Sequence, residues 1–193
     1  MNKKSKRQEL KKLVEKSIIR DEEKKKIGWS ATTSINEVLI SLNSTVSGLD
    51  DVQVRKNRMI YGKNQTSEDK NKNIIHIILE SINQPTCNVI RKNMNLISIP
   101  SKDLVVGDIV HLSEGDVVPA DLRVIESNGL MVDETSIDKD RKAVKKISGI
   151  CLCELEKVTD YKNIVLMGSN VTKGSADAVV LSVGDHTILE TMS

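Results

Sequence analysis

The sequence of 193 residues predicts an α+β fold in which N-terminal helices pack beside a β domain. Apolar residues follow helical spacing as far as Tyr61, and from Thr86 onward short apolar runs alternate with glycine-containing turns. Phe is absent and aromatic residues make up 2%, so Ile, Val, Leu and Met must fill the core, which favours aliphatic β layers. The length suits one compact domain, or one domain with an appended helical arm.

The first predicted unit is a charged helical arm over residues 1–33. Four aliphatic residues fall at helical spacing among Lys, Arg and Glu: Leu10, Leu13, Val14 and Ile18. This pattern fits a surface helix with one apolar stripe, and it also fits a basic amphipathic helix that contacts anionic lipid or a partner. Glu15 and the acidic run at 21–23 dilute the basic face, so we favour the surface helix.

Residues 34–65 predict two further helices with clear start signals. Two pairs have the spacing of a capping box, in which a capping side chain is followed three positions later by Glu or Gln: Ser34 with Glu37, and Asp50 with Gln53. Gly62 is placed to end the second helix, because glycine readily adopts the left-handed backbone found there.

The β domain is expected to span residues 86–187, followed by a C-terminal stub at 188–193. Apolar runs at 89–90 and 96–99 flank a polar segment at 93–95, which is the pattern of a hairpin. Gly-Asp and Asn-Gly pairs punctuate the later apolar runs. Many short strands at such spacing indicate a compact sandwich or a distorted barrel.

Residues 66–85 are expected to form a polar linker and a short helix. The longest apolar stretch, at 74–82, falls far short of the roughly 20 residues that a bilayer-spanning helix needs. The basic start has no apolar segment behind it, so no signal peptide is visible. Three cysteines, Cys87, Cys151 and Cys153, cannot all pair internally, and a reduced, cytosolic compartment is the simpler interpretation.

The composition argues against nucleic acid or a metal ion as a direct partner. The formal net charge is +2, whereas nucleic-acid-binding domains usually carry a marked basic excess, and aromatic side chains for stacking bases are nearly missing. The three histidines, His76, His111 and His186, are widely separated and match no ligand pattern, so we interpret them as ordinary hydrogen-bonded residues. The cysteines lack a nearby third or fourth ligand.

The most informative stretch covers residues 100–146. It holds three runs in order: LVVGDIV from Leu104, EGDVVPAD from Glu114 and VDETSI from Val132. Glycine permits tight turns with positive φ, and a following Asp can bond to the backbone of its own turn. Together the runs resemble the actuator domain of P-type cation-transporting ATPases. Residues 34–64 resemble the N-terminal region of such cation transporters, and IVLMGSNV from Ile164 resembles the end of the actuator domain.

The resemblance implies a distorted β jelly-roll, similar to a double-stranded β-helix, on the cytosolic side of a membrane. In an intact pump such a domain couples hydrolysis of an aspartyl-phosphate to movement of the membrane helices. The implied partners are therefore the phosphorylation domain and the membrane helices, in the same chain or in another, with the membrane contacted only through them. Within the family, HLSEGDVVPADLRVIES from His111 and LMGSNV from Leu166 most resemble magnesium transporters, and pumps for other cations stay open as alternatives.

The resemblance implies no cofactor bound by this chain, and it implies ATP and Mg²⁺ only for an intact pump. The phosphorylated Asp-Lys-Thr-Gly-Thr motif of the family is missing from the sequence, and no Walker-type phosphate loop replaces it. We therefore expect that the chain alone does not hydrolyse ATP.

The resemblance also places a catalytic loop, but with altered residues. Where the family has Thr-Gly-Glu-Ser, this sequence has Asp138, Lys139, Asp140 and Arg141. The family's Glu orients water for attack on the aspartyl-phosphate, and Asp140 is shorter by one methylene, about 1.5 Å. Lys139 adds bulk where the family's Gly lets the backbone approach the phosphate. We expect impaired hydrolysis, although Lys139 and Arg141 could instead attract a phosphoryl group.

Two functions remain open at this point. The first is the soluble actuator portion of a P-type cation pump, as a fragment or a degenerate relative. The second is a standalone, non-catalytic regulatory or interaction module with an actuator fold, which docks on a pump or another protein. The altered loop favours the second function, as does the short polar stretch at 65–73 where the family has two membrane helices.

Overall fold

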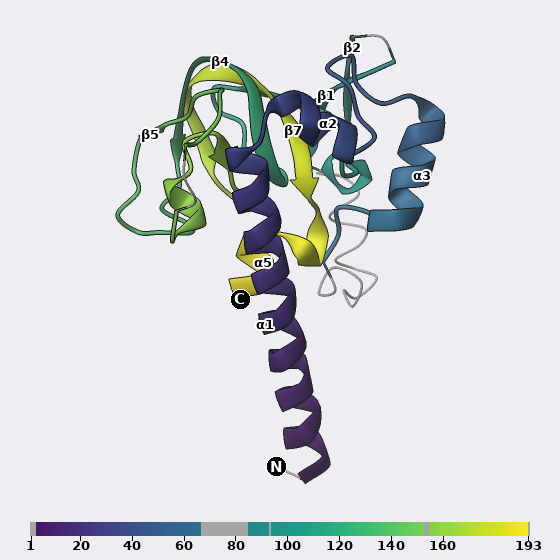
Figure 1. Cartoon of the computed structure of the whole chain (residues 1–193), viewed down its shortest axis with the longest axis vertical. Coiled ribbons are helices and arrows are strands. Elements are labelled where there is room, and N and C mark those ends of the chain that lie inside the picture. Colours follow the sequence, from purple (N-terminus) through teal and green to yellow (C-terminus); the bar gives the residue numbers. More distant parts are fainter. Residues whose placement is uncertain (1–2, 67–84, 93, 153–154, 193) are drawn as a thin grey trace.

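The computed structural model of the chain describes residues 3–66, 85–92, 94–152 and 155–192 (Figure 1). It confirms the α+β fold, with helices in the N-terminal part and an antiparallel sheet in the remainder. The helix predicted over residues 74–82 and most of the predicted linker lie outside the described residues. Among the helices described, none combines the length and the apolar character needed to cross a membrane.

The longest helix, α1 (Lys3–Thr32), has two halves with different surroundings. Figure 1 shows the first half extending away from the body and the second half lying against it. The last carbonyls of a helix have no partner within the helix. Here Arg123 Nε donates to Ser30 O at 3.0 Å and Asn163 Nδ2 donates to Ala31 O at 2.8 Å. The β domain therefore completes the end of α1 and holds it in place.

Two shorter helices, α2 (Ile35–Ser41) and α3 (Asp51–Tyr61), begin where the sequence predicts. The Ser34 side chain accepts a hydrogen bond from the Glu37 backbone, and Asp50 and Gln53 form the full capping box. Gly62 ends α3 with a φ of 81°. These starts and stops are confirmed because each depends on contacts within one turn of chain.

The described strands form one seven-stranded antiparallel sheet in the order β2-β1-β3-β7-β4-β5, with β6 paired to β4. Their bounds are β1 (Thr86–Arg91), β2 (Asn95–Pro100), β3 (Ile109–Ser113), β4 (Asp121–Asp133), β5 (Val144–Lys145), β6 (Ile164–Val165) and β7 (Asn170–Ser182). Within the part of the chain that the structure describes, the short 3₁₀ helices η2 (Ser101–Asp103), η3 (Val158–Asp160) and η4 (Gly184–His186) lie in the connections. The predicted hairpin is confirmed as the β1–β2 pair.

The longest ladder joins β4 and β7, each 13 residues long, and it is interrupted by several register shifts. At one shift Gly174 has a φ of 74°, and a Cβ there would lie 2.5 Å from the Asn128 carbonyl oxygen. Glycine is therefore required for this close approach. Figure 1 shows both strands curving over the top of the body, which lets one sheet enclose an aliphatic core.

The Gly-Asp turns behave as the sequence predicts. Asp108 accepts a hydrogen bond from the Val105 backbone at 2.9 Å, within its own turn. The same fully buried carboxylate receives Arg91 Nε at 2.7 Å, so one Asp holds both its turn and strand β1.

The last described residues form a short helix, α5 (Ile188–Met192), where the sequence predicts a stub. Fully buried Asp121, at the start of β4, accepts hydrogen bonds from the Met167 backbone at 2.9 Å and from the Ile188 backbone at 2.7 Å. Burial raises the pKa of Asp121 to about 7, against the opposing effect of these two hydrogen bonds. Figure 1 shows α5 beside α1, so the C-terminal segment is docked on the arm.

Candidate functional site

The loop between β4 and β5, residues 134–143, carries the four predicted site residues. Its backbone closes on itself: the Glu134 carbonyl accepts from Ile137 at 2.9 Å and from Asp138 at 3.0 Å, and the Glu134 N–H donates to the Arg141 carbonyl at 2.9 Å. Because residues 134 and 141 are joined in this way, the residues between them form a compact turn at the end of β4.

A buried ion pair holds the base of this loop. Glu134 and Lys146 are both fully buried, and Glu134 Oε1 lies 2.6 Å from Lys146 Nζ. Lys146 Nζ also donates to the Tyr161 carbonyl at 3.3 Å. Burial lowers the pKa of Lys146, while the charge of Glu134 opposes that shift. Removing one partner from such a pair leaves an uncompensated buried charge, so the pair strongly fixes the start of the loop to the residue that follows β5.

Arg141 belongs to the base of the loop as well. Its Nε lies 3.1 Å from Glu134 Oε2, and its Nη1 lies 2.8 Å from Asp160 Oδ1. Its Nη2 donates to the Thr159 carbonyl. We call Glu134, Arg141, Lys146 and Asp160 the loop-base cluster. Arg141 therefore ties the loop to η3.

The remaining predicted site residues lie at the tip of the loop. Lys139 and Asp140 are exposed, and Asp138 is half-buried. The Asp140 N–H donates to Asp138 Oδ1 at 3.4 Å, which places the Asp138 carboxylate inside the turn. Of the four residues, two thus present a carboxylate and an ammonium group to solvent, and the other two, Asp138 and Arg141, make contacts within the loop region.

Two polar contacts fix the chain where it enters the loop. Asp133 Oδ1 accepts from the Thr135 backbone at 2.9 Å and from its hydroxyl at 2.6 Å, and these bonds lower the pKa of Asp133. Ser136 Oγ donates to the Gly168 carbonyl at 3.0 Å. The first contact fixes the entry of the loop locally, and the second anchors the loop to the connection between β6 and β7.

Two family models match the chain, one over the β domain and the other over the region of α2 and α3. The model of the P-type ATPase actuator domain matches residues 81–193, more than half of the chain. The chain belongs to this family. The N-terminal model of cation transporters and ATPases matches residues 30–90, which include α2 and α3.

Similar proteins are much longer than this actuator chain. Calcium-transporting ATPase 1 of Lactococcus lactis is 38% identical over 109 residues, which are 56% of this chain and 12% of that protein. Cation-transporting ATPase pma1 of Synechocystis is 40% identical over 99 residues, 51% of this chain and 11% of that protein. Potassium-transporting ATPase alpha chain 2 of rabbit is 34% identical over 122 residues, which are 63% of this chain and 11% of that protein. The chain spans about a tenth of the length of these relatives.

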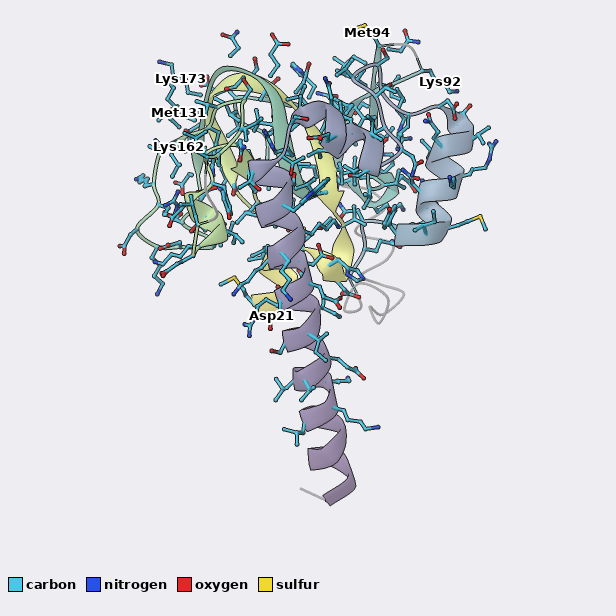
Figure 2. The ribbon with its side chains drawn as sticks, viewed as in Figure 1. Asp21, Lys92, Met94, Met131, Lys162 and Lys173 are labelled. Carbon is cyan, nitrogen blue, oxygen red and sulfur yellow. The ribbon has the colours of Figure 1, made fainter. Side chains whose placement is uncertain are left out.

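A lysine-rich surface adjoins the actuator loop. Lys145 on β5 lies opposite Met131 on β4, and Met131 lies opposite Lys173 on β7. Directly opposed residues of antiparallel strands point to the same face of a sheet, so the two lysines flank the methionine. Figure 2 shows Met131 and Lys173 together with Lys162 on the same side of the actuator domain. Three lysines, Lys145, Lys162 and Lys173, therefore lie on this side of the domain.

A second ionic cluster joins α1 to the end of β7. Glu23 Oε1 lies 3.2 Å from His186 Nδ1, Glu23 Oε2 lies 3.3 Å from Lys26 Nζ, and the Ser182 hydroxyl donates to Glu23 Oε2. We call these four residues the arm cluster. They line a cavity of about 290 Å³ that also touches Tyr61.

The contacts within the arm cluster shift the pKa values of Glu23 and His186. Burial raises the pKa of Glu23, but the contacts with His186, Lys26 and Ser182 outweigh it, so that the pKa is lowered overall. The hydrogen bond with Glu23 raises the pKa of His186. His111 also pairs with a carboxylate, with Nδ1 at 2.6 Å from Asp177 Oδ1, while His76 lies outside the described residues.

Sequence reasoning missed the loop-base cluster. The VDETSI run was visible as a family run, yet nothing in the sequence indicates that Glu134 pairs with Lys146 or Arg141 with Asp160. One usable signal was present in the sequence. Glu134 and Lys146 each lie next to a predicted aliphatic strand, and a carboxylate and an ammonium group in such positions are candidates for a buried ion pair.

Proposed function

We propose that this chain is the actuator module of a cation-transporting P-type pump and that its loop faces the phosphorylation domain, in the same chain or in another. Family membership supports the proposal, and one observation carries the part concerning the loop. The buried Glu134–Lys146 pair holds the loop base, while Lys139 and Asp140 stay exposed at the tip. A domain that delivers a loop to another domain requires this combination of a fixed base and an accessible end.

We further propose that residues 138–141 are the counterpart of the family's catalytic loop and that this loop hydrolyses the aspartyl-phosphate poorly. Asp140 reaches about 1.5 Å less far than a Glu, and a misplacement of about 1 Å can cost on the order of 100-fold in rate. Arg141 stands where the family has Ser, and its guanidinium is occupied by Glu134 and Asp160. The tip therefore lacks both the reach and the small residues that suit close approach to a phosphoryl group.

Grafting the loop into an active P-type pump tests this proposal. A pump that carries Asp-Lys-Asp-Arg in place of its Thr-Gly-Glu-Ser should accumulate phosphoenzyme, with dephosphorylation slowed about 100-fold or more. A pump that carries only the Glu-to-Asp change is the matched control for the shorter carboxylate. Decay of the grafted phosphoenzyme at the normal rate contradicts the proposal.

The setting that follows from this proposal is the cytosolic face of a membrane, with the phosphorylation domain and membrane helices of a pump as partners. ATP and Mg²⁺ serve the intact pump, and we expect no ATP hydrolysis by the chain alone. A colorimetric phosphate assay on the purified chain checks this expectation. Turnover that disappears in Asp140→Ala would show that the loop is active.

We propose Mg²⁺ as the ion transported by the parent pump, on the ground of the resemblance to magnesium transporters that the runs beginning at His111 and Leu166 carry. The relatives compared above are named for calcium, for cations in general and for potassium. Uptake of Mg²⁺, Ca²⁺ and K⁺ by cells with and without the pump that this module serves decides among them. Uptake of Ca²⁺ or K⁺ alone contradicts the magnesium assignment.

A second candidate is a standalone, non-catalytic module that docks on a pump. The contacts of Arg141 favour it, because they commit one of the four loop positions to the module's own structure. Co-purification separates the two candidates. Stable capture of a separately encoded P-type ATPase supports the standalone module, and covalent continuity with the remaining pump domains supports the first proposal.

A further inference from the structure

The first half of α1 carries an aliphatic stripe that the body of the protein does not cover. Figure 1 shows this half of the helix extending away from the sheet and from α5. The stripe consists of Leu10, Leu13, Val14 and Ile18, whose exposed fractions lie between 53% and 62%. In Figure 2 Asp21 lies where the helix meets the body, and this residue ends the stripe. Leu10 to Ile18 span about 12 Å along the helix axis at about 1.5 Å per residue.

The stripe occupies a different face of α1 from the residues that pack on the β domain. The packed face is formed by Glu23, Ile27 and Ala31, all buried. At about 100° per residue, the centre of the stripe is rotated about a third of a turn from the centre of that face. The stripe is therefore not an extension of the face that packs on the β domain, so packing against that domain does not explain it.

The charged residues along the same half of the helix are mostly basic. Between positions 3 and 20 eight residues are basic and two are acidic. Lys11 is exposed and lies within about a quarter turn of the stripe centre, whereas Glu15, Lys16 and Lys12 lie about a third of a turn or more away. An exposed aliphatic stripe on a helix segment with this excess of basic residues suits a surface that is apolar just beneath a layer of negative charge.

We propose that the first half of α1 binds the surface of an anionic membrane, with the aliphatic stripe inserted at the headgroup level and the lysines above anionic lipids. This is a direct membrane contact, in addition to any contact through the membrane helices of a pump, and it does not rest on the proposed function. Two further observations exclude a coiled coil with a second copy. Two such arms would repel each other, and four aliphatic residues over about 12 Å fall short of the three to four heptads that a stable seam needs.

Co-sedimentation of the full chain with lipid vesicles tests the proposal. The chain should bind vesicles of phosphatidylcholine mixed with phosphatidylserine, and vesicles of phosphatidylcholine alone should retain at least about tenfold less. Binding should weaken as salt is added, because ions screen attraction between exposed charges. Failure to bind the mixed vesicles at low salt overturns the proposal.

Substitutions separate the stripe from general basicity. The triple variant Leu10→Gln/Leu13→Gln/Val14→Gln should lose at least about tenfold in binding. The matched control, Ile40→Gln/Val52→Gln/Met59→Gln, removes as many exposed apolar side chains from α2 and α3 and should bind as the wild type does. Circular dichroism checks that both variants remain folded. Equal binding of the stripe variant and the control overturns insertion of the stripe.

Analytical ultracentrifugation tests the competing occupant. The chain should sediment as a monomer at the concentrations used with vesicles. A dimer that is lost in the stripe variant would show that a second copy covers the stripe, and this result also overturns the proposal.

Discussion

The two ionic clusters of the molecule differ in how far water reaches them. In the loop-base cluster, Glu134 and Lys146 are completely buried. In the arm cluster, the carboxylate of Glu23 is buried, but its partner His186 is about half exposed and its partner Lys26 about a third exposed. A pair in which both groups are buried cannot lose one charge without a large desolvation cost, whereas a half-exposed partner such as His186 can be replaced by water more cheaply. The comparison indicates that the position of the actuator loop is built into the fold, while the attachment of the arm can respond to solution conditions.

The largest expected effect comes from removing one buried charge of the loop base. Lys146→Met should lower the free energy of unfolding by about 3 kcal/mol, because it leaves Glu134 buried without its closest counter-charge. Urea denaturation measures the change. Lys145→Met, at the exposed neighbouring position, is the control and should stay within about 0.5 kcal/mol of the wild type. Equal stability of the two variants would show that the buried pair does not hold the loop.

The next effect concerns Arg141, which is part of the loop-base cluster but still touches solvent. Arg141→Ser, which introduces the residue proposed as its family counterpart, removes contacts to Glu134, Asp160 and the Thr159 carbonyl, so we expect a loss of about 1–3 kcal/mol. Lys139→Ser, at the exposed tip, should change stability by less than about 0.5 kcal/mol. Thermal and urea unfolding of both variants check this order, and a reversed order would contradict the division into base and tip.

The smallest effect is the pH dependence of the arm cluster. Because the folded-state pKa of His186 is raised above its ordinary 6.5, its pairing with Glu23 stabilises the fold fully below that value. The stabilisation is lost as pH rises through the raised pKa. The lowered pKa of Glu23 means that its own contribution is lost when pH falls below its ordinary 4.5 and through the lowered value. Since His186 is half exposed, we expect less than about 1 kcal/mol.

Unfolding of His186→Gln at several pH values measures this contribution. The variant should be less stable than the wild type near pH 5–6, and the difference should shrink at alkaline pH. In a background of Glu23→Gln, the substitution of His186 should have no further pH-dependent effect. A difference that grows with pH would contradict the assignment to this pair.

Local signals account for what the sequence predicted well. The caps at Ser34 and Asp50 and the turn at Asp108 depend on residues three positions apart. A short stretch of sequence therefore shows each residue together with its hydrogen-bond partner. The hairpin of β1 and β2 follows from apolar runs on either side of a short polar turn.

What the sequence did not predict depends on distant segments. Arg141 meets Asp160 across 19 positions, and no local pattern indicates which of the nearby carboxylates it will reach. The helix α5 exists because Asp121, 67 positions earlier, accepts the Ile188 N–H in a buried site. The stripe on α1 was visible as a pattern, but its exposure depends on which face the body covers. The roles of residues 138–141 remain predictions that the graft experiment addresses.

Strand β4 links two of these distant places directly. It begins at Asp121, which holds the start of α5, and ends at Asp133, next to the loop. At about 3.3 Å per residue its contour length is roughly 40 Å, and most of it is hydrogen-bonded to β7. Displacing the loop relative to α5 would require breaking that ladder. A force applied to the loop at Lys139 would therefore be transmitted along β4 to α5. The loop and α5 would then move together as a rigid body.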